Sequence, residues 1–147
     1  MEEKVKVANI LLVEDNAADI ALTKKAIEKS KIVNNLSITR DGEEAMDFLY
    51  KKGKYSDAKK PDLIILDLNL PKKDGREILE EVKKDEDLKK IPVVILTTSN
   101  AEKDILKTYN LYANCYITKP LDFDQFIAIV KQINDFWFSI VKLPRDE

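Results

Sequence analysis

Apolar runs of strand length alternate along the chain with amphipathic stretches of helix length. The candidate strands are Lys6–Val13, Leu36–Thr39, Leu63–Asp67, Val93–Thr97 and Ala113–Ile117. The candidate helices are Ala17–Ser30, Glu43–Tyr50, Gly75–Lys84, Ala101–Tyr109 and about Asp122–Val141. Two of the strands are solid aliphatic runs without alternation, as expected for central strands that helices cover on both faces. The pattern predicts an α/β fold of repeated βα units on a parallel sheet.

Length and composition indicate one domain. The 147 residues lie within the usual size of a single domain, and no Gly/Ser-rich or Pro-rich linker, repeat or low-complexity tract interrupts the pattern. We therefore expect one domain over residues 1–147, with an extended last helix at about 122–141 and no effector domain. The long connection Lys51–Pro61 carries a glycine and many lysines, so we expect an exposed loop before the third strand.

The chain contains no histidine, which excludes several kinds of chemistry at once. Ser-His-Asp and Cys-His catalysis, histidine-ligated metals and a phosphohistidine intermediate all need that side chain. The single cysteine, Cys115, allows no internal disulfide, and the charged start MEEKVKV is unlike a secretory signal, so we expect a cytoplasmic protein. The net charge of −2 and the short aliphatic runs argue against nucleic acid and membrane as partners.

Residues with chemically useful side chains gather where the predicted strands end. They are Glu14 and Asp15 after the first strand, Asp67 at the end of the third, Thr97 at the end of the fourth, and Thr118 and Lys119 after the fifth. In open parallel sheets ligands bind at the carboxyl ends of the strands, so we expect these groups to converge. Clustered carboxylates repel one another unless a cation joins them, and their oxygens suit Mg²⁺, or Mn²⁺ in its place.

This set of residues implies phosphoryl transfer to an aspartate. With a cation bound, one carboxylate remains as a nucleophile, while Lys119 and Thr97 can each contact a phosphoryl oxygen. Each residue alone has a simpler explanation. Glu14 and Asp15 suit an acidic helix N-terminus, Asp67 a turn, Thr97 a helix cap, and Lys119 the surface. Taken together, the simpler explanations are less convincing, because unrelated residues would seldom place all of these groups at successive strand ends.

Four segments, in this order and spacing, resemble the response-regulator receiver domain, whose members include the chemotaxis protein CheY. They are ILLVEDN with Glu14 and Asp15, LIILDLNLPKKDG with Asp67, IPVVILTTS with Thr97, and CYITKP with Lys119. The resemblance covers nearly the whole chain. It implies a doubly wound (βα)5, flavodoxin-like fold with a five-stranded parallel sheet of order 2-1-3-4-5, and a single-domain response regulator of a two-component phosphorelay.

The resemblance also implies roles for the acidic residues. Asp67 would accept a phosphoryl group from a phosphohistidine on a sensor histidine kinase. Glu14, Asp15 and Asp67 would hold Mg²⁺ together with the backbone carbonyl of Asn69. Many members of the family have aspartate where this chain has Glu14, but glutamate still supplies an oxygen ligand.

Further roles are implied for residues of the fourth and fifth strands. Lys119 would contact the phosphoryl group, Thr97 would move toward it on activation, and Tyr116 would turn inward to fill the vacated space. A cis peptide bond is implied before Pro120. The loop before the third strand and the ending INDFWFSIVKLP resemble the small receivers that partner phytochromes, which implies a phytochrome-type kinase.

Three other functions remain as alternatives. A Mg²⁺-dependent phosphohydrolase working through an aspartyl-phosphate would need a general acid where this chain has Asn69. A flavodoxin-like cofactor binder needs a loop rich in Ser, Thr and Gly where this chain reads EDNAADIA. A non-phosphorylated pseudo-receiver would normally have lost a carboxylate or the lysine. We therefore expect a signalling protein rather than an enzyme, with self-catalysed phosphorylation and dephosphorylation at most.

The last predicted helix carries more apolar surface than one core face requires. Ile129, Phe136 and Ile140 widen a stripe that includes Trp137, and the arc exceeds the ~100° expected for a surface helix. Aromatic residues are favoured at interface cores, so we hypothesise a symmetric homodimer through this helix and the fifth strand. The alternative is that the tail after Asp135 folds back on its own domain.

Overall fold

The computed structural model describes residues 7–30, 33–70, 72–98, 113, 115–119, 122–129 and 131–132. Within these residues five parallel strands form one sheet in the order β2-β1-β3-β4-β5, which confirms the predicted order. The strands are β1 (Ala8–Val13), β2 (Asn34–Thr39), β3 (Leu63–Asp67), β4 (Val93–Thr97) and β5 (Cys115–Thr118).

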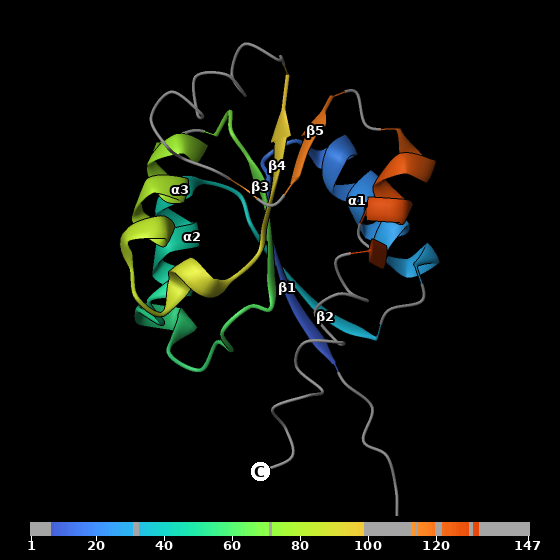
Figure 1. Ribbon diagram of the computed structural model, residues 1–147. Helices are drawn as coiled ribbons and strands as arrows, with labels where there is room; N and C mark the ends of the chain where they lie inside the picture. Colours follow the sequence, from blue (N-terminus) through green and yellow to red (C-terminus); the bar gives the residue numbers. More distant parts are fainter. Residues whose placement is uncertain are drawn as a thin grey trace, which may run out of the picture.

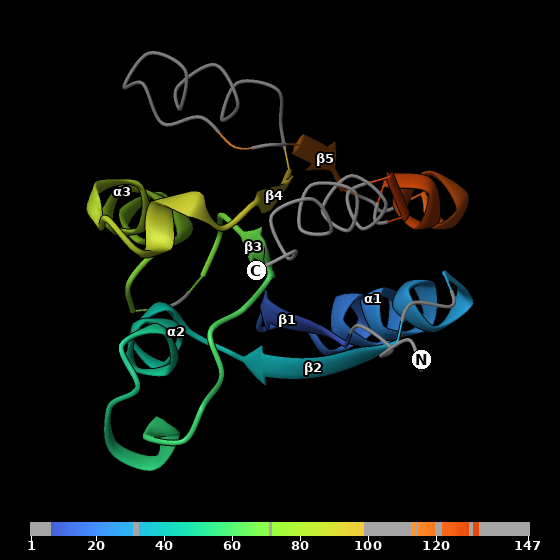
Figure 2. The same ribbon diagram turned by 60° about the horizontal axis from the view of Figure 1, so that its bottom comes forward.

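Helices cover both faces of the sheet (Figure 1). The labelled helices are α1 (Ala17–Lys29), α2 (Gly42–Leu49) and α3 (Gly75–Lys84), with short 3₁₀ turns η1 (Gly53–Tyr55) and η2 (Leu88–Lys90). Figure 2 shows α2 and α3 on one face, and α1 with the helical residues 123–129 on the other. None of the described helices is long and apolar enough to cross a membrane.

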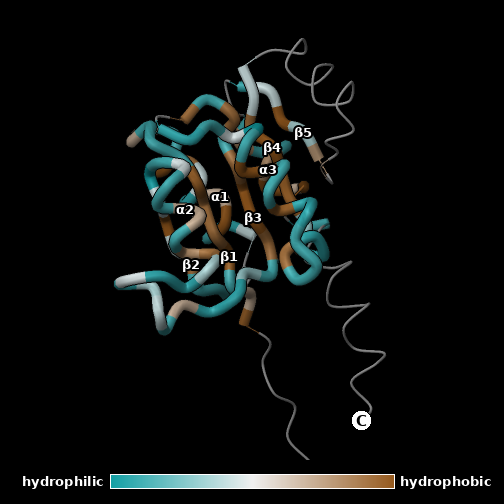
Figure 3. The backbone as a smooth tube through the Cα atoms, turned by 90° about the vertical axis from the view of Figure 1, so that its left-hand side faces the viewer, coloured by the Kyte–Doolittle hydropathy of each residue, from teal (hydrophilic) through white to brown (hydrophobic). Residues whose placement is uncertain are grey.

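The central strands divide the apolar side chains between two cores. Leu11 and Val13 face the core beneath α2 and α3, whereas Ile10 and Leu12 face the core beneath α1, because successive side chains of a strand point to opposite faces. Figure 3, which looks onto the sheet from the side of α2 and α3, shows the central strands as largely hydrophobic and these helices as more polar. Strands buried on both faces need no polar alternation, which explains the solid aliphatic runs in the sequence.

Each labelled helix begins at a polar cap close to the end of a strand. The side chains of Asn16, Asp41 and Asp74 accept backbone N–H groups in the first turns of α1, α2 and α3. Asp74 also forms a reciprocal capping box with Glu77. The caps follow the preceding strand ends by three residues for α1, two for α2 and seven for α3, and each fixes the point where its helix begins.

The structure confirms the predicted bounds of β3, β4 and α3 and changes others by one or two residues. Strand β2 begins earlier than predicted, at Asn34, because pairing with β1 extends two asparagines of low strand propensity. Helix α2 runs from Gly42 to Leu49, because the cap is Asp41. Two further elements differ from their predicted bounds. Strand β5 is Cys115–Thr118, and helix α1 ends at Lys29.

The expectation of an exposed loop over Lys51–Pro61 is wrong in part. Turn η1 lies within it, and Tyr55 and Ala58 are partly buried against the α2–α3 core. The ring of Tyr55 meets Phe48 edge-on, with ring centroids 5.2 Å apart, and its hydroxyl donates to Glu44.

Two predicted segments are not covered. The candidate helix 101–109 and the final helix beyond residue 132 lie outside the described residues.

Candidate functional site

The predicted site residues meet at the carboxyl-terminal edge of the sheet. Glu14 and Asp15 directly follow β1, Asp67 ends β3, Thr97 ends β4, and Lys119 follows β5 by one residue. Strands β1, β3, β4 and β5 are consecutive neighbours in the sheet, so these side chains leave adjacent strand ends. The edge of an open α/β sheet at this position is where ligands bind.

Three carboxylates form a group suited to a divalent cation. Glu14, Asp15 and Asp67 each offer one oxygen, and these oxygens all lie within 4.8 Å of one another. Glu14 and Asp67 are buried, whereas Asp15 is exposed. Oε1 of Glu14 is buried without a hydrogen bond among the described residues and has Lys119 Nζ 3.2 Å away as its ion-pair partner, so a bound cation would compete with the lysine for this oxygen. An all-oxygen donor set of this size fits Mg²⁺ or Mn²⁺.

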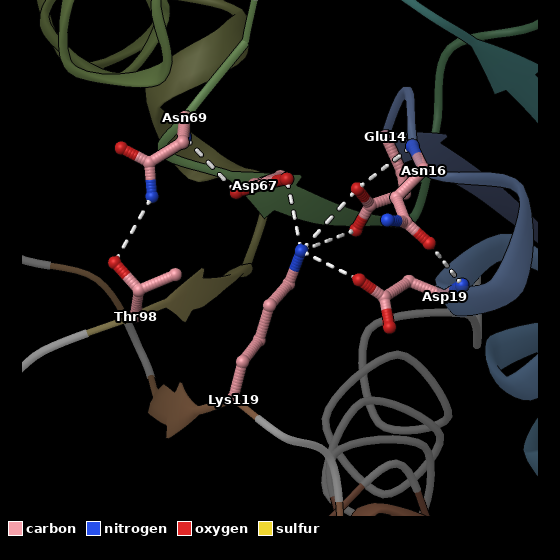
Figure 4. A network of polar contacts seen from close by, with 7 residues as sticks. All are labelled: Glu14, Asn16, Asp19, Asp67, Asn69, Thr98 and Lys119. Atoms are coloured by element: carbon pink, nitrogen blue, oxygen red, sulfur yellow. Dashed lines mark hydrogen bonds and ion pairs between the residues drawn. The ribbon is translucent and has the colours of Figure 1, made fainter.

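The ammonium group of Lys119 lies among the carboxylates (Figure 4). Its Nζ is 3.0 Å from Asp67 Oδ2, 3.2 Å from Glu14 Oε1 and 2.8 Å from Asp19 Oδ2. The lysine side chain is 15% exposed, and the three acidic side chains are between 0% and 23% exposed. These ion pairs are therefore partly shielded from water, where charge interactions are stronger than at an open surface.

Crowding of the charges changes two protonation equilibria. Burial, followed by the hydrogen bond and the negative charge of Asp67, raises the pKa of Glu14 from 4.5 to about 8, although Lys119 opposes the shift. Burial lowers the pKa of Lys119, but hydrogen bonds to Asp19 and Asp67 outweigh burial and raise it above its usual value. Without a cation, the site thus favours a charged lysine and a protonated Glu14 at neutral pH.

The backbone around Asp67 holds its carboxylate in one orientation. The N–H of Asn69 donates to Asp67 Oδ1 over 2.9 Å, so Oδ2 is directed to Lys119. Gly75, at the start of α3, donates its N–H to the Leu68 carbonyl over 3.0 Å. A Cβ at Gly75 would lie 2.5 Å from the Asp67 carbonyl oxygen, so this close approach requires glycine.

The ends of β4 and β5 join the site through backbone and side-chain contacts. Thr97 is fully buried, and its carbonyl accepts the N–H of Lys119 over 2.7 Å. Asn69 Nδ2 donates to Thr98 Oγ1 over 3.3 Å, which links the loops after β3 and β4. Tyr116 is half-buried against the α2–α3 core, and its hydroxyl accepts the N–H of Ala113 over 3.0 Å.

Some contacts were not predicted from the sequence. The ion pair of Asp19 and the close approach of Gly75 were missed, because neither residue belongs to the strand ends on which the prediction rested. Asn16, which caps α1 and donates its N–H to Glu14 Oε2 over 3.3 Å, was missed as well. A polar residue directly after an acidic pair was the available signal for the cap.

Other predicted residues lie apart from the site or outside the described part. Pro120, Phe136, Trp137 and Ile140 are not among the described residues. Ile129 is partly buried against the core beneath α1, so part of its apolar surface is covered by its own chain.

Comparison with known proteins gives close relatives over most of the chain. Response regulator Rcp1 of Synechocystis sp. is 50% identical over 135 residues, which cover 92% of both chains. The crystal structure of the phosphorylated cyanobacterial phytochrome response regulator RcpA matches with a TM-score of 0.78 and 52% identity, covering 92% of this chain and 96% of that one. The Mn²⁺-bound form of Rcp1 matches with a TM-score of 0.75 and 49% identity, covering 88% and 94%.

The family match agrees with the observed fold. Residues 10–131 match the response regulator receiver domain and so include all five strands except the start of β1. The sheet order is the one that the resemblance implied. The chain belongs to the response regulator receiver domain family.

Proposed function

We propose that this chain is a single-domain response regulator that accepts a phosphoryl group on Asp67 from a sensor histidine kinase in a Mg²⁺-dependent reaction. The observation that carries the proposal is the environment of Asp67. Its buried carboxylate has one oxygen held by the Asn69 N–H and the other 3.0 Å from a lysine ammonium, with two further carboxylates within 4.8 Å.

In the proposed transfer, an oxygen of the Asp67 carboxylate attacks the phosphorus of a phosphohistidine. The new O–P bond forms as the P–N bond breaks, and the electron pair of that bond leaves with the imidazole nitrogen. The donor histidine lies outside these 147 residues, which contain none. Lys119 would neutralise a phosphoryl oxygen, and Thr97 would donate to another after moving toward it.

A divalent cation fits this reaction. Glu14, Asp15, Asp67 and the carbonyl of Asn69 would hold Mg²⁺ or Mn²⁺, which supplies charge neutralisation to the phosphoryl oxygens when bound. The Mn²⁺-bound form of Rcp1 supports the same chemistry here.

The readout of phosphorylation is proposed to pass through β4 and β5. Movement of Thr97 would leave space at the sheet edge, and Tyr116 would turn inward to fill it. That step would break the contact between the Tyr116 hydroxyl and the Ala113 N–H. Such a switch needs two packings that differ by only a few kcal/mol, a difference that a phosphoryl charge can bias.

The proposed partners follow from the relatives. RcpA is a phytochrome response regulator, and its 52% identity supports a phytochrome-type kinase as the phosphodonor. We also propose a symmetric homodimer through the last helix and β5. Ile129 would contribute only part of its side chain to that interface, because it is partly buried against the core of its own chain. A monomeric mass by light scattering at micromolar concentration would contradict it. We also propose a cytoplasmic location and no enzymatic turnover beyond self-catalysed phosphorylation and dephosphorylation.

The mass of the intact protein after incubation with acetyl phosphate tests the proposal. We expect one phosphoryl adduct with Mg²⁺ and none with a chelator. Asp67→Asn should abolish the adduct, whereas Asp57→Asn, a matched change in an exposed loop residue, should leave it unchanged. An adduct that survives Asp67→Asn, or forms without a divalent cation, would contradict the proposal.

A further inference from the structure

Asp19 makes the shortest ion pair of the site, although no strand-end pattern includes it. Its Oδ2 is 2.8 Å from Lys119 Nζ, compared with 3.0 Å for Asp67 and 3.2 Å for Glu14. Figure 4 shows the ammonium of Lys119 between Asp19 on one side and Asp67 on the other. Asp19 therefore contacts the lysine from the side of α1, opposite the strand that carries Asp67.

Asp19 is held in place by the N-terminal cap of α1. Its backbone N–H donates to the Asn16 side chain over 2.9 Å, which places it in the capped first turn of α1. A carboxylate there is stabilised by the helix dipole. Its side chain is 23% exposed and that of Lys119 is 15% exposed, so the pair is more shielded than a surface salt bridge.

A bound cation would contact Glu14 and Asp67, the other two partners of Lys119, but not Asp19. Glu14 and Asp67 belong to the group of three carboxylates whose oxygens lie within 4.8 Å, and Asp19 does not. A cation held by that group would compete with Lys119 for the oxygens of Glu14. The contact with Asp19 needs no change when the cation binds.

The three N–H donors of the Lys119 ammonium limit how many partners it can contact at once. An ammonium group has three N–H donors, and Lys119 has three acidic partners. Once Glu14 is engaged by the cation, one donor becomes available to a phosphoryl oxygen while the others keep the side chain in place.

We propose that Asp19 is a positioning residue that holds Lys119 Nζ beside Asp67, so that the donor released from Glu14 is directed at the incoming phosphoryl group. This inference rests on the proposed phosphoacceptor function. Asp19 acts through the lysine and neither binds the cation nor touches the phosphoryl group.

Phosphorylation kinetics with acetyl phosphate at saturating Mg²⁺ test the inference. We expect Asp19→Asn to slow phosphorylation roughly tenfold, less than the ~10²-fold that a 1 Å misplacement can cost, because the contact with Asp67 remains. Asp19→Glu should recover part of the rate. Glu43→Gln removes a first-turn carboxylate from α2 that is not among the partners of Lys119 or in the group of three carboxylates, and it should leave the rate unchanged. The Mg²⁺ affinity of Asp19→Asn should stay within about threefold of the unmodified protein, since Asp19 is not a ligand.

A double-mutant cycle separates positioning from a general loss of structure. Lys119→Met removes the group through which Asp19 acts, so adding Asp19→Asn to it should change the rate less than about twofold. Multiplicative effects of the two changes would overturn the inference. So would a normal rate for Asp19→Asn, or a Mg²⁺ affinity that falls as much as the rate.

A measurement without phosphorylation distinguishes this inference from the proposed function. In ¹⁵N-lysine-labelled protein, the Lys119 Nζ resonance is assigned by its loss in Lys119→Met. Its protons should exchange slowly with water, both with and without Mg²⁺, and faster in Asp19→Asn with Mg²⁺ bound. If this dependence is seen but no phosphoryl adduct forms, the proposed function fails while the contact stands. Exchange that is the same in both proteins would refute the positioning role.

Discussion

The raised pKa of Glu14 predicts that Mg²⁺ binding depends on pH across the neutral range. Burial and the adjacent Asp67 bring this pKa to about 8 when no cation is bound. A cation needs the ionised carboxylate, so binding must release the proton. Raising the pH removes the competing proton, and the apparent affinity for Mg²⁺ should therefore increase with pH.

The size of the effect follows from the ionised fraction of Glu14. With a pKa near 8, about 1% is ionised at pH 6, about 10% at pH 7 and about half at pH 8. The apparent Mg²⁺ affinity should therefore rise about tenfold from pH 6 to pH 7 and about fivefold from pH 7 to pH 8, and level off by about pH 9.

Stability without the cation should have the opposite pH dependence. Between 4.5, the pKa in the unfolded chain, and about 8 in the folded protein, the native state binds more protons than the unfolded state. The free energy of unfolding contributed by Glu14 therefore falls as pH rises through this window. Saturating Mg²⁺ should reverse part of that loss, because it binds the ionised folded form.

Isothermal titration calorimetry measures the predicted linkage. Titrations in buffers of different ionisation enthalpy count the protons released, and we expect about one per Mg²⁺ between pH 6 and pH 7. Glu14→Gln has no proton to release and should show weaker binding with little pH dependence over this range. An affinity that is flat from pH 6 to pH 8, or a pH slope that survives in Glu14→Gln, would refute the reasoning.

Three local features of the fold give further predictions. Each is tested by measuring the free energy of unfolding of a variant in urea. Gly75→Ala would put a Cβ 2.5 Å from the Asp67 carbonyl oxygen and should cost about 1–3 kcal/mol and slow phosphorylation; an unchanged rate would contradict the close approach. Asp74→Ala removes the capping box of α3 and should cost about 1 kcal/mol, with exposed Asp57→Ala close to neutral as its control. Lys72 has a φ of 64°, so Lys72→Gly should be neutral or stabilising by up to about 1 kcal/mol, whereas Lys73→Gly should not stabilise.

The sequence predicted most of the sheet, because strands buried on both faces carry an unambiguous aliphatic signal. The bounds of β3 and β4 were correct for this reason, and the strand ends then located Glu14, Asp67 and Lys119 at one edge. Strand β2 was less accurate, because its two leading asparagines become extended only through pairing with β1.

Contacts between segments distant in the sequence could not be predicted in the same way. The segment EDNAADIA gives no sign that Asp19 meets a lysine 100 positions later. The lysine-rich segment around Tyr55 predicts an exposed loop, yet the ring packs edge-on against Phe48. In both places the position of the side chain depends on a tertiary contact that the local sequence does not reveal.

Chemical identification of the phosphorylated residue tests the central claim most directly. The protein is incubated with acetyl phosphate and Mg²⁺, treated with borohydride, which reduces an acyl phosphate to the alcohol, and digested for peptide mass spectrometry. We predict homoserine at position 67 alone, dependent on Mg²⁺ and absent when acetyl phosphate is omitted. Conversion at another aspartate or glutamate, or none at position 67 despite an adduct on the intact protein, would contradict the assignment of Asp67 as the phosphoacceptor.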